Sequence, residues 1–402
     1  MKILMIGPAS SASKNFGLGL ATEQIASVLG TKSDLTIISP AAEKEIKPDT
    51  DKSHKQVKIE ERLLSTRSIE SSVVQIDITS RITPYFYHSE KATETQQESH
   101  SSSDIQEALK QYNDLVVEQA QSIPYDVIYA HDWLSIGAGL ALKAKYNRPL
   151  VLHIHALDYD RTGKKTNSWQ YQLEKEGMEK ADRIIAVSNY HALIMQGEYG
   201  IAKEKIEVVH LAVEAKESSD YQSPFKEKIV LFAGRLSQQK GVFQFIEMAA
   251  LLSKENHNLR YVVAGDGELS EQVVSRVHEK GLSNYFNFTG LLERADLLAL
   301  MKESELLVMP SVSEPFGLVA LEAAQQELPI VLSKNSGVSE ILSDALIPET
   351  NSTEDFVNVI ELVLNEDKRV MESVVENKKA AASRTWAQVG EQIIKFLAKA
   401  DE

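Results

Sequence analysis

Short apolar runs alternate with amphipathic stretches along most of the chain, and many of the runs stop at Gly or at a polar residue. Residues 2–6 and 228–233 both start with Lys, continue with apolar residues and lead directly into Gly. Apolar runs of this length predict buried strands, and the stretches between them predict helices. Two similar series of such segments predict two parallel-sheet α/β halves, with ligands at the carboxyl ends of the strands.

The pattern divides the chain into four consecutive parts. We expect an N-terminal Rossmann-like domain at 1–212, a linker at 213–226, a C-terminal Rossmann-like domain at 227–382 and a bracing helix at 383–402. The linker is polar and has no clear periodicity. Residues 41–111 are rich in Glu, Lys, Ser, Thr and Gln and predict a polar, irregular insertion, although residues 73–78 alternate like a strand.

Composition narrows the class of protein. A chain of 402 residues is longer than one ordinary core supports. The net charge of −15 argues against nucleic acid, whose binding needs clustered Lys and Arg. The chain has no Cys, which excludes disulfides and thiolate zinc sites and fits the cytoplasm. No apolar run approaches the roughly 18 residues of a membrane span, and residues 1–7 are too short for a signal peptide.

One stretch of the C-terminal half predicts a strand, a loop and a helix in close succession. Residues 306–309 are apolar, Pro310 and Pro315 break the strand, and residues 316–326 predict the helix. The first backbone N–H groups of a helix have no acceptor inside it, and with the helix dipole they form an anion site. The amides that we expect there belong to Phe316, Gly317 and Leu318.

Two glutamates flank this predicted helix start. Glu314 lies in the loop before the helix, and Glu322 lies about 9–12 Å further along at ~1.5 Å per residue. A pyrophosphate at the helix start would then have a hexose at one end, beside Glu314, and a ribose at the other, beside Glu322. Two glutamates at this spacing, without other signals, are more often a helix cap and part of a solvated helix face. Whether they form a binding site therefore depends on motifs elsewhere in the chain.

Other residues of the kind that bind phosphate occur in both halves. Arg235 and Lys240 flank one strand-to-helix loop, and a guanidinium with an ammonium suits a diphosphate. Gly17 and Gly19 precede a predicted helix, and Gly265 follows a predicted strand. Glycine lets the backbone approach a phosphate closely, although each of these features alone is as typical of an ordinary turn or surface cation.

Polar side chains also follow two strands of the N-terminal half. Residues 126–133 end in His-Asp-Trp, and residues 149–155 end in His155. Sites in α/β proteins form at such strand ends. His153 and His155 share one face of their strand, so one of them can simply be a core residue. We expect His155, at the end of the strand, to be the functional one. Asp132 belongs to the same group of residues.

Together these residues resemble retaining glycosyltransferases of family 4 and their glycogen and starch synthase relatives. The resemblance extends over nearly the whole chain. Its motifs are Gly17-Leu-Gly19, His131-Asp-Trp133, His155, Gly234-Arg235 to Lys240-Gly241, Gly265-Asp-Gly267, and Glu314-Pro-Phe-Gly317 to Glu322. The resemblance implies the GT-B fold, in which two Rossmann-like domains face a central cleft and a C-terminal helix braces them.

The resemblance implies an enzyme that transfers a hexose, with glucose favoured, from a nucleotide diphosphate sugar of the UDP- or ADP-glucose type to a glucan or oligosaccharide. It implies that Arg235, Lys240 and the amides at 316–318 hold the diphosphate. Glu314 would position the sugar and Glu322 would hold the ribose. The sugar and acceptor would meet His155, Asp132 and Asp158. The family works without a metal, because cations and amides replace one electrostatically.

Two features depart from the family pattern or compete with it. Glucan synthases usually have paired glycines before Leu-Gly, whereas Phe16 stands first here. Asp158-Tyr-Asp160 matches the metal–nucleotide signature of another class of sugar transferase, but this short pattern is common by chance, and we expect no metal there. Asp158 would instead orient a substrate hydroxyl or an arginine.

Three other functions remain as alternatives. The first is a transferase of the same fold acting on a lipid-linked or cell-surface glycan. The second is a nucleotide-sugar-binding protein without turnover, which the joint presence of Glu314, Arg235, Lys240 and His155 disfavours. The third is a dinucleotide oxidoreductase, which is disfavoured because Thr22 stands where the third Gly of that motif would be.

Overall fold

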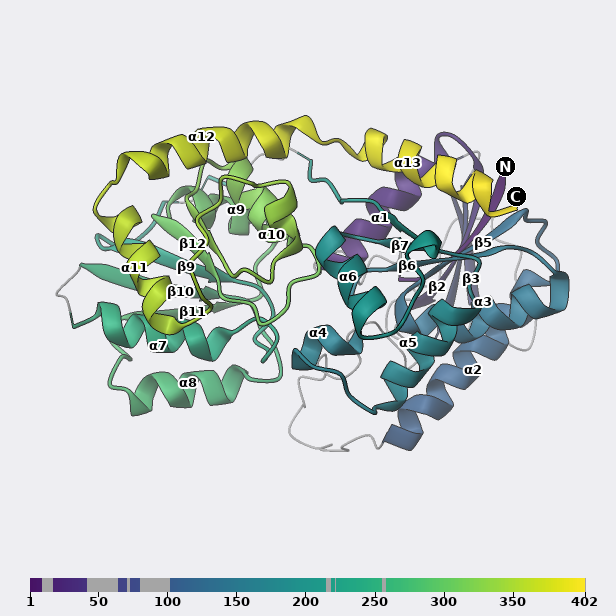
Figure 1. The fold of residues 1–402 in the computed structure, drawn as a ribbon, viewed down its shortest axis with the longest axis horizontal. Helices are drawn as coiled ribbons and strands as arrows, with labels where there is room; N and C mark the ends of the chain where they lie inside the picture. The colour runs from purple at the N-terminus through teal and green to yellow at the C-terminus, as the bar shows by residue number, and fades with distance from the viewer. Residues whose placement is uncertain are drawn as a thin grey trace.

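The computed structural model contains two α/β halves, each built around one sheet (Figure 1). The predicted α/β class is confirmed. The described residues are 1–8, 17–41, 64–70, 73–79, 102–214, 218–220, 222–254 and 258–401.

The N-terminal half contains an eight-stranded sheet. Its strands are β1 (Lys2–Ile6), β2 (Asp34–Ala41), β3 (Leu64–Glu70), β4 (Val73–Thr79), β5 (Val127–His131), β6 (Leu150–Ile154), β7 (Arg183–Ala186) and β8 (Ile206–Val208). They lie in the order β3-β4-β2-β1-β5-β6-β7-β8, and all neighbours are parallel except β3 and β4. Strands β5 and β6 are buried along their whole length, as expected where helices cover both faces of a parallel sheet.

Helices connect these strands. They are α1 (Gly17–Gly30), α2 (Ser102–Ala120), α3 (Asp132–Tyr146), α4 (Asp158–Thr162), α5 (Trp169–Lys180), α6 (Asn189–Gly197) and the 3-10 turn η2 (Lys203–Lys205). Strand β6 therefore leads through a short segment into α4, and β7 leads into α6. The segments after β5, β6 and β7 lie at one edge of the sheet, because neighbouring parallel strands end on the same side.

The C-terminal half contains a five-stranded, fully parallel sheet. Its strands are β9 (Lys228–Ala233), β10 (Leu259–Ala264), β11 (Phe286–Gly290), β12 (Leu306–Met309) and β13 (Ile330–Leu332), in the order β11-β10-β9-β12-β13. Its helices are α7 (Val242–Leu252), α8 (Ser270–Glu279), α9 (Arg294–Lys302), α10 (Leu318–Gln325), η3 (Gly337–Glu340), α11 (Thr353–Leu364) and α12 (Lys368–Ser383).

The chain ends in α13 (Trp386–Ala398) and the turn η4 (Lys399–Asp401), which return to the N-terminal half (Figure 1). Thr385 and Gln388 form a capping box at the start of α13. The helix packs on α1, and Lys32 Nζ in the turn after α1 lies 2.7 Å from a carboxylate oxygen of Glu391. The helix predicted at the C-terminus is thus present. It contacts the N-terminal half, whereas α12, directly before it in the chain, belongs to the C-terminal half.

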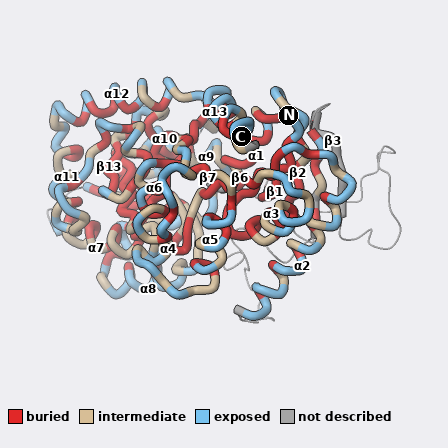
Figure 2. Tube along the Cα trace, turned by 45° about the vertical axis from the view of Figure 1, so that its right-hand side comes forward, coloured by how far each residue is buried: buried red, intermediate tan, exposed pale blue. Residues whose placement is uncertain are grey.

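Buried residues follow the strands and the inward sides of the helices (Figure 2). One apolar cluster contains Ile25 of α1, Leu307 of β12 and Ile393 of α13. The cores of the two halves are therefore continuous through the C-terminal helix. The sites discussed below lie at the carboxyl ends of strands in both sheets.

Two predicted helix starts are wrong by a few residues. Helix α10 starts at Leu318 rather than at residue 316, because Gly317 has a φ of 114° and cannot be helical. Gly17 and Gly19 lie inside the first turn of α1 rather than before it. Helix α3 starts at Asp132, directly after strand β5.

The predicted insertion at 41–111 is described only in part. Its strand-like segment is confirmed as β4, and β4 pairs with β2 in the main sheet. Helix α2 begins within its last ten residues. Residues 42–63, 71–72 and 80–101, like Phe16, lie outside the described residues.

Candidate active site

Lys240 and Glu314 form an ion pair at the carboxyl edge of the C-terminal sheet. Lys240 Nζ lies 2.6 Å from Glu314 Oε2, and Ser311 Oγ donates a hydrogen bond to the same oxygen at 3.2 Å. The side chain of Glu314 is 6% exposed and that of Lys240 is 27% exposed. The arrangement thus combines a nearly buried carboxylate with an ammonium that still reaches the surface.

Close backbone packing brings the loops of this edge together. A Cβ atom on Gly265, which has a φ of 144°, would lie 1.9 Å from Gly234 O. A Cβ atom on Gly241, which has a φ of 72°, would lie 2.0 Å from Pro310 O. Glycine is required at both positions, because any side chain would separate the loops. Arg235, partly exposed, lies in the first of these loops.

The start of α10 follows the same loop. Gly317 is the N-cap residue, so the amides of Leu318 and the residues directly after it lie in the first helical turn, and that of Phe316 lies before the helix. The preceding segment runs beside residues 336–338, where Gly337 N donates to Glu314 O at 2.9 Å and Val338 N donates to Phe316 O at 2.8 Å. These bonds fix the backbone on both sides of Pro315.

Glu322 is paired with an arginine that the sequence interpretation missed. Arg294 Nε lies 2.9 Å from Glu322 Oε1, and the glutamate is nearly buried. Arg294 is the first residue of α9, where the helix dipole disfavours a cation. An arginine at that position is a sequence signal for an acidic partner elsewhere.

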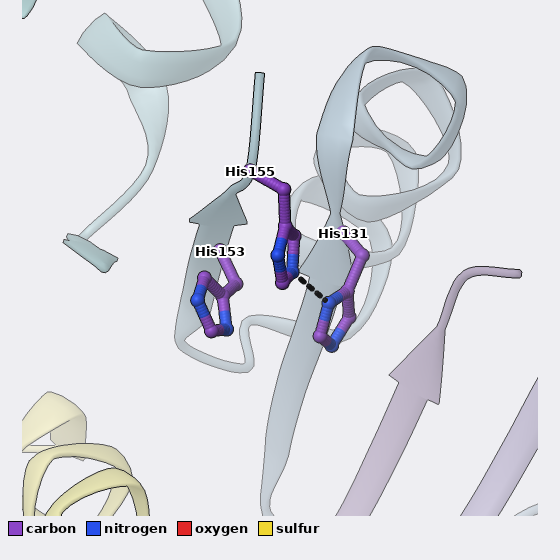
Figure 3. Close-up of side chains that lie close together, drawn as sticks. All are labelled: His131, His153 and His155. Atoms are coloured by element: carbon purple, nitrogen blue, oxygen red, sulfur yellow. Dashed lines mark hydrogen bonds between the residues drawn. The ribbon is translucent and has the colours of Figure 1, made fainter. Parts of the chain in front are cut away.

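Three histidines lie side by side at the ends of β5 and β6 (Figure 3). His131 Nδ1 lies 3.1 Å from His155 Nε2, and the two rings stack with an interplanar angle of 18°. His153 is fully buried and its Nδ1 lies 2.6 Å from Tyr129 OH, which makes it a core residue with a polar partner. Burial, with a contribution from His191, lowers the pKa of His155 to about 3, so the ring is neutral at pH 7.

Among the residues that the structure describes, His131, His153 and His155 are the group whose ring nitrogens lie close enough to suggest a metal ion. These nitrogens lie within 4.8 Å of one another. Zinc bound at ~2.0–2.1 Å places its ligand nitrogens roughly 3.3 Å apart. His131 Nδ1 and His155 Nε2 already lie 3.1 Å apart, but their rings are stacked and would have to turn before both nitrogens could point at one ion.

Asp132 holds the backbone of His155. Its Oδ1 accepts a hydrogen bond from His155 N at 2.6 Å, and its own φ is 53°, a region that residues other than glycine seldom adopt. The side chain is buried, and burial raises the pKa of Asp132 to about 7. Backbone strain next to a buried carboxylate is characteristic of functional sites.

The two carboxylates of the Asp158-Tyr-Asp160 pattern have different partners. Asp158 Oδ2 accepts hydrogen bonds from Thr166 Oγ1 at 2.5 Å and Ser168 Oγ at 2.9 Å. Asp160 Oδ2 accepts one from Leu157 N at 2.7 Å. Both side chains are buried.

Two family descriptions match consecutive parts of the chain. Residues 213–381 match the glycosyl transferases group 1, and residues 100–217 match Glycosyltransferase Family 4. The two matches together extend over residues 100–381. The chain belongs to the glycosyltransferases of the family 4 type. The predicted family is thereby confirmed.

Curated relatives of this glycosyltransferase have several activities. An uncharacterized glycosyltransferase of Methanocaldococcus jannaschii is 29% identical over 54% of this chain, and a glycogen synthase of Mycobacterium tuberculosis is 29% identical over 54%. The matched regions cover 60% and 53% of those relatives, so the chain spans little more than half of their length. A D-inositol 3-phosphate glycosyltransferase of Corynebacterium aurimucosum is 25% identical over 69% of this chain and 72% of its own.

Solved structures confirm the GT-B fold. Sucrose-phosphate synthase from Thermosynechococcus elongatus superposes with a TM-score of 0.77 at 16% identity, over 99% of this chain and 98% of its own. Anabaena HepE in complex with UDP and glucose superposes with a TM-score of 0.70 at 20% identity, over 99% of each chain.

The glycosyltransferase brings its predicted residues into separate groups. Lys240 contacts Glu314, and Asp132 contacts His155. Glu322 lies beyond the first turn of α10 and contacts Arg294.

No helix of the described residues has the length and apolar character needed to cross a membrane.

Proposed function

We propose that this glycosyltransferase moves a hexose, with glucose favoured, from a nucleotide diphosphate sugar to a glucan or oligosaccharide in the cytoplasm. We further propose that it retains the anomeric configuration and needs no metal. The observation that carries the proposal is the Lys240–Glu314 pair directly before the start of α10. Related structures with bound UDP and glucose, and the glycogen synthase relative, support the donor and acceptor classes.

The C-terminal half would bind the donor. Arg235, Lys240 and the first amides of α10 would neutralise the diphosphate as it leaves, each in a position that needs little reorganisation. Gly265, which packs against Gly234 O, would let the loop backbone approach a phosphate closely. In this proposal Glu314 accepts hydrogen bonds from the hexose hydroxyls and Glu322 from the ribose.

The N-terminal half would meet the sugar and the acceptor. His155 Nε2 is engaged by His131, so the Nδ1 edge of a neutral ring would face the substrate. Asp132 would fix the backbone of His155 rather than touch the sugar. Asp158 would shape the acceptor side through the segment that contains Thr166. Gly17 and Gly19 would let the first turn of α1 approach the donor.

Front-face transfer agrees best with these contacts. Glu314 is engaged by Lys240 and Ser311, which makes it a poor nucleophile. In a front-face reaction the bond from the anomeric carbon to the leaving phosphate breaks while the acceptor oxygen bonds on the same side. The acceptor's proton passes to the leaving phosphate oxygen. Closure of the two halves would exclude water, which otherwise competes as acceptor.

A small phosphorylated acceptor is the second candidate. It is favoured by the inositol phosphate glycosyltransferase, which matches more of this chain than the glycogen synthase does. A transferase for lipid-linked or cell-surface glycans is a further alternative, and assays with each acceptor class separate the three.

A thermal-shift panel tests the donor proposal. UDP-, ADP- and GDP-sugars would be added in EDTA, with the free nucleotides as controls, because a ligand that binds only the folded state raises Tm. We expect one nucleotide series to stabilise the protein without metal. NMR of the product should then give the donor's anomeric configuration. Stabilisation only with a divalent cation, or an inverted product, would contradict the proposal.

A further inference from the structure

A buried carboxylate of the N-terminal half reaches the loop that carries Glu314. Ser313 Oγ donates a hydrogen bond to Asp160 Oδ1 at 2.5 Å. Both side chains are fully buried. Hydrogen bonds to a charged acceptor are stronger than neutral ones, and a buried carboxylate loses much when a donor is removed. The contact therefore holds Ser313, and with it the neighbouring glutamate, against the opposite half.

The same carboxylate holds the segment that follows His155. Asp160 Oδ2 accepts a hydrogen bond from Leu157 N at 2.7 Å, two residues after His155, and lies 3.2 Å from His191 Nε2. One side chain thus joins the backbone beside His155 to the backbone beside Glu314. These are the two residues that the proposed function places on opposite sides of the transferred sugar.

Two further contacts from α6 reach the same loop. Tyr190 OH lies 2.9 Å from Ser313 Oγ, and Ser188 Oγ donates to Pro315 O at 2.5 Å. The backbone on each side of Glu314 is held by the N-terminal half, whereas the Glu314 side chain stays with Lys240 of its own half. The orientation of the glutamate therefore depends on both halves.

From these contacts we infer that Asp160 is a positioning residue that couples closure of the two halves to the placement of Glu314. The inference rests on the proposed function, because Glu314 has a sugar to position only if the chain transfers one. Separation of the halves breaks the bond to Ser313 and releases the loop. Closure restores the bond and sets the spacing between Glu314 and His155.

The test compares Ser313→Ala with Ser373→Ala in the full-length protein. Ser373 is a matched control, since it is also a buried serine of the C-terminal half but bonds to a backbone carbonyl, that of Asp344. For Ser313→Ala we expect kcat to fall about 10- to 100-fold, because small misplacements of a reacting group have effects of this size. We expect the Kd of UDP to stay within about twofold, and the share of donor lost to water to rise.

Variants of Asp160 extend the test. Asp160→Ala combined with Ser313→Ala should lower kcat no further than Asp160→Ala alone, because Asp160→Ala already removes the bond to Ser313. Asp160→Asn should retain more activity than Asp160→Ala, since the Asn side chain can accept a hydrogen bond from Leu157 N and donate one to Ser313 Oγ. A kcat for Ser313→Ala equal to that of Ser373→Ala would overturn the inference about Asp160 but leave the proposed function standing. A wild-type protein inactive with every nucleotide sugar would overturn the proposed function, and the inference with it.

Discussion

Lys240 and Glu314 illustrate how two side chains far apart in sequence define a site at the residue scale. The carboxylate is nearly buried, and the ammonium of Lys240 lies 2.6 Å from it. A substrate phosphate would compete for that ammonium, and a hexose hydroxyl would then donate to the released carboxylate oxygen. The pair is thus suited to respond to a donor that carries both groups.

Lys240→Met should reduce activity strongly and leave the fold intact. Methionine keeps the apolar stem but removes the charge that would stabilise the leaving diphosphate, and loss of one such group costs about 10²–10³-fold in rate. The partly unpaired Glu314 should lower the free energy of unfolding by roughly 1–3 kcal/mol. Initial rates and thermal melts check both effects. Lys254→Met, at an exposed lysine after α7, is the control, and equal rates in the two variants would contradict the assignment.

Glu174 of α5 should make stability depend on pH. It is buried and accepts hydrogen bonds from Asp158 N and Tyr199 OH, and burial raises its pKa to about 8. The folded state therefore binds a proton that the unfolded state has lost above pH ~4.5. The stabilisation that protonated Glu174 gives to the folded state is fully present below pH ~4.5 and is lost as the pH rises through about 8. The free energy of unfolding falls by at most ~1.4 kcal/mol per pH unit.

Glu174→Gln should flatten this part of the stability profile. Melting temperatures between pH 4.5 and 8.5 measure the effect, on an otherwise identical protein. Glu176→Gln is the matched control, because Glu176 is an exposed glutamate of the same helix. A wild-type slope that Glu174→Gln leaves unchanged would show that other groups dominate the pH dependence.

At the element scale, helix α6 joins the two halves through its first turn. The amides of Asn189 and Tyr190 donate to the Glu340 carboxylate at 2.9 and 2.8 Å, and His210 Nε2 lies 2.6 Å from it. Burial raises the pKa of Glu340, but the bonds from His210 and from the α6 amides outweigh it, so the pKa lies below its usual value. A carboxylate at a helix N-terminus is also favoured by the dipole.

Glu340→Ala should therefore weaken the contact between the halves. We expect the free energy of unfolding to fall by about 1–3 kcal/mol, because two helix-start amides lose their acceptor. The loss should shrink as the pH falls through the carboxylate's lowered pKa, since the wild-type contribution itself disappears there. Denaturant melts at several pH values measure it, with Glu349→Ala at an exposed glutamate as control. Equal melts for the two variants would contradict this role.

Element types were predictable from the sequence where hydrophobic runs are short and end in Gly or polar residues. Strand β12 lies at the predicted residues 306–309, because Pro310 ends the apolar run directly after it. Helix starts were less predictable. The start of α10 depends on the positive φ of Gly317, and a glycine near a helix start is equally compatible with either conformation.

At the scale of the whole molecule, the sequence predicted two halves and the residues at their strand ends. It did not predict how the halves meet. Asp160 was interpreted as half of a doubtful metal pattern, yet its carboxylate bonds to Ser313 of the opposite half. Arg294 was missed for the same reason. Contacts between distant segments depend on how the sheets are placed in space, which local periodicity does not encode.

Helix α13 provides the last test, because it connects the end of the C-terminal half to α1. A Cβ atom on Gly390 would lie 2.2 Å from Val28 Cγ1, so the helices approach too closely for any side chain there. Gly390→Leu should gain about 1 kcal/mol of helix propensity, but overpacking of this kind costs typically 1–3 kcal/mol and more when the backbone must shift. We expect a net loss of stability and a lower Tm.

Ala387→Leu is the matched control for this substitution, because Ala387 lies on the exposed face of the same helix. It adds the same side chain without a clash and should leave Tm nearly unchanged. If Gly390→Leu lowers Tm and also raises the KM for the donor or the acceptor, the brace affects how the halves meet as well as how stable they are. If both variants melt like the wild type, α13 does not hold the N-terminal half, and the continuous core through Ile393 would contribute little to stability.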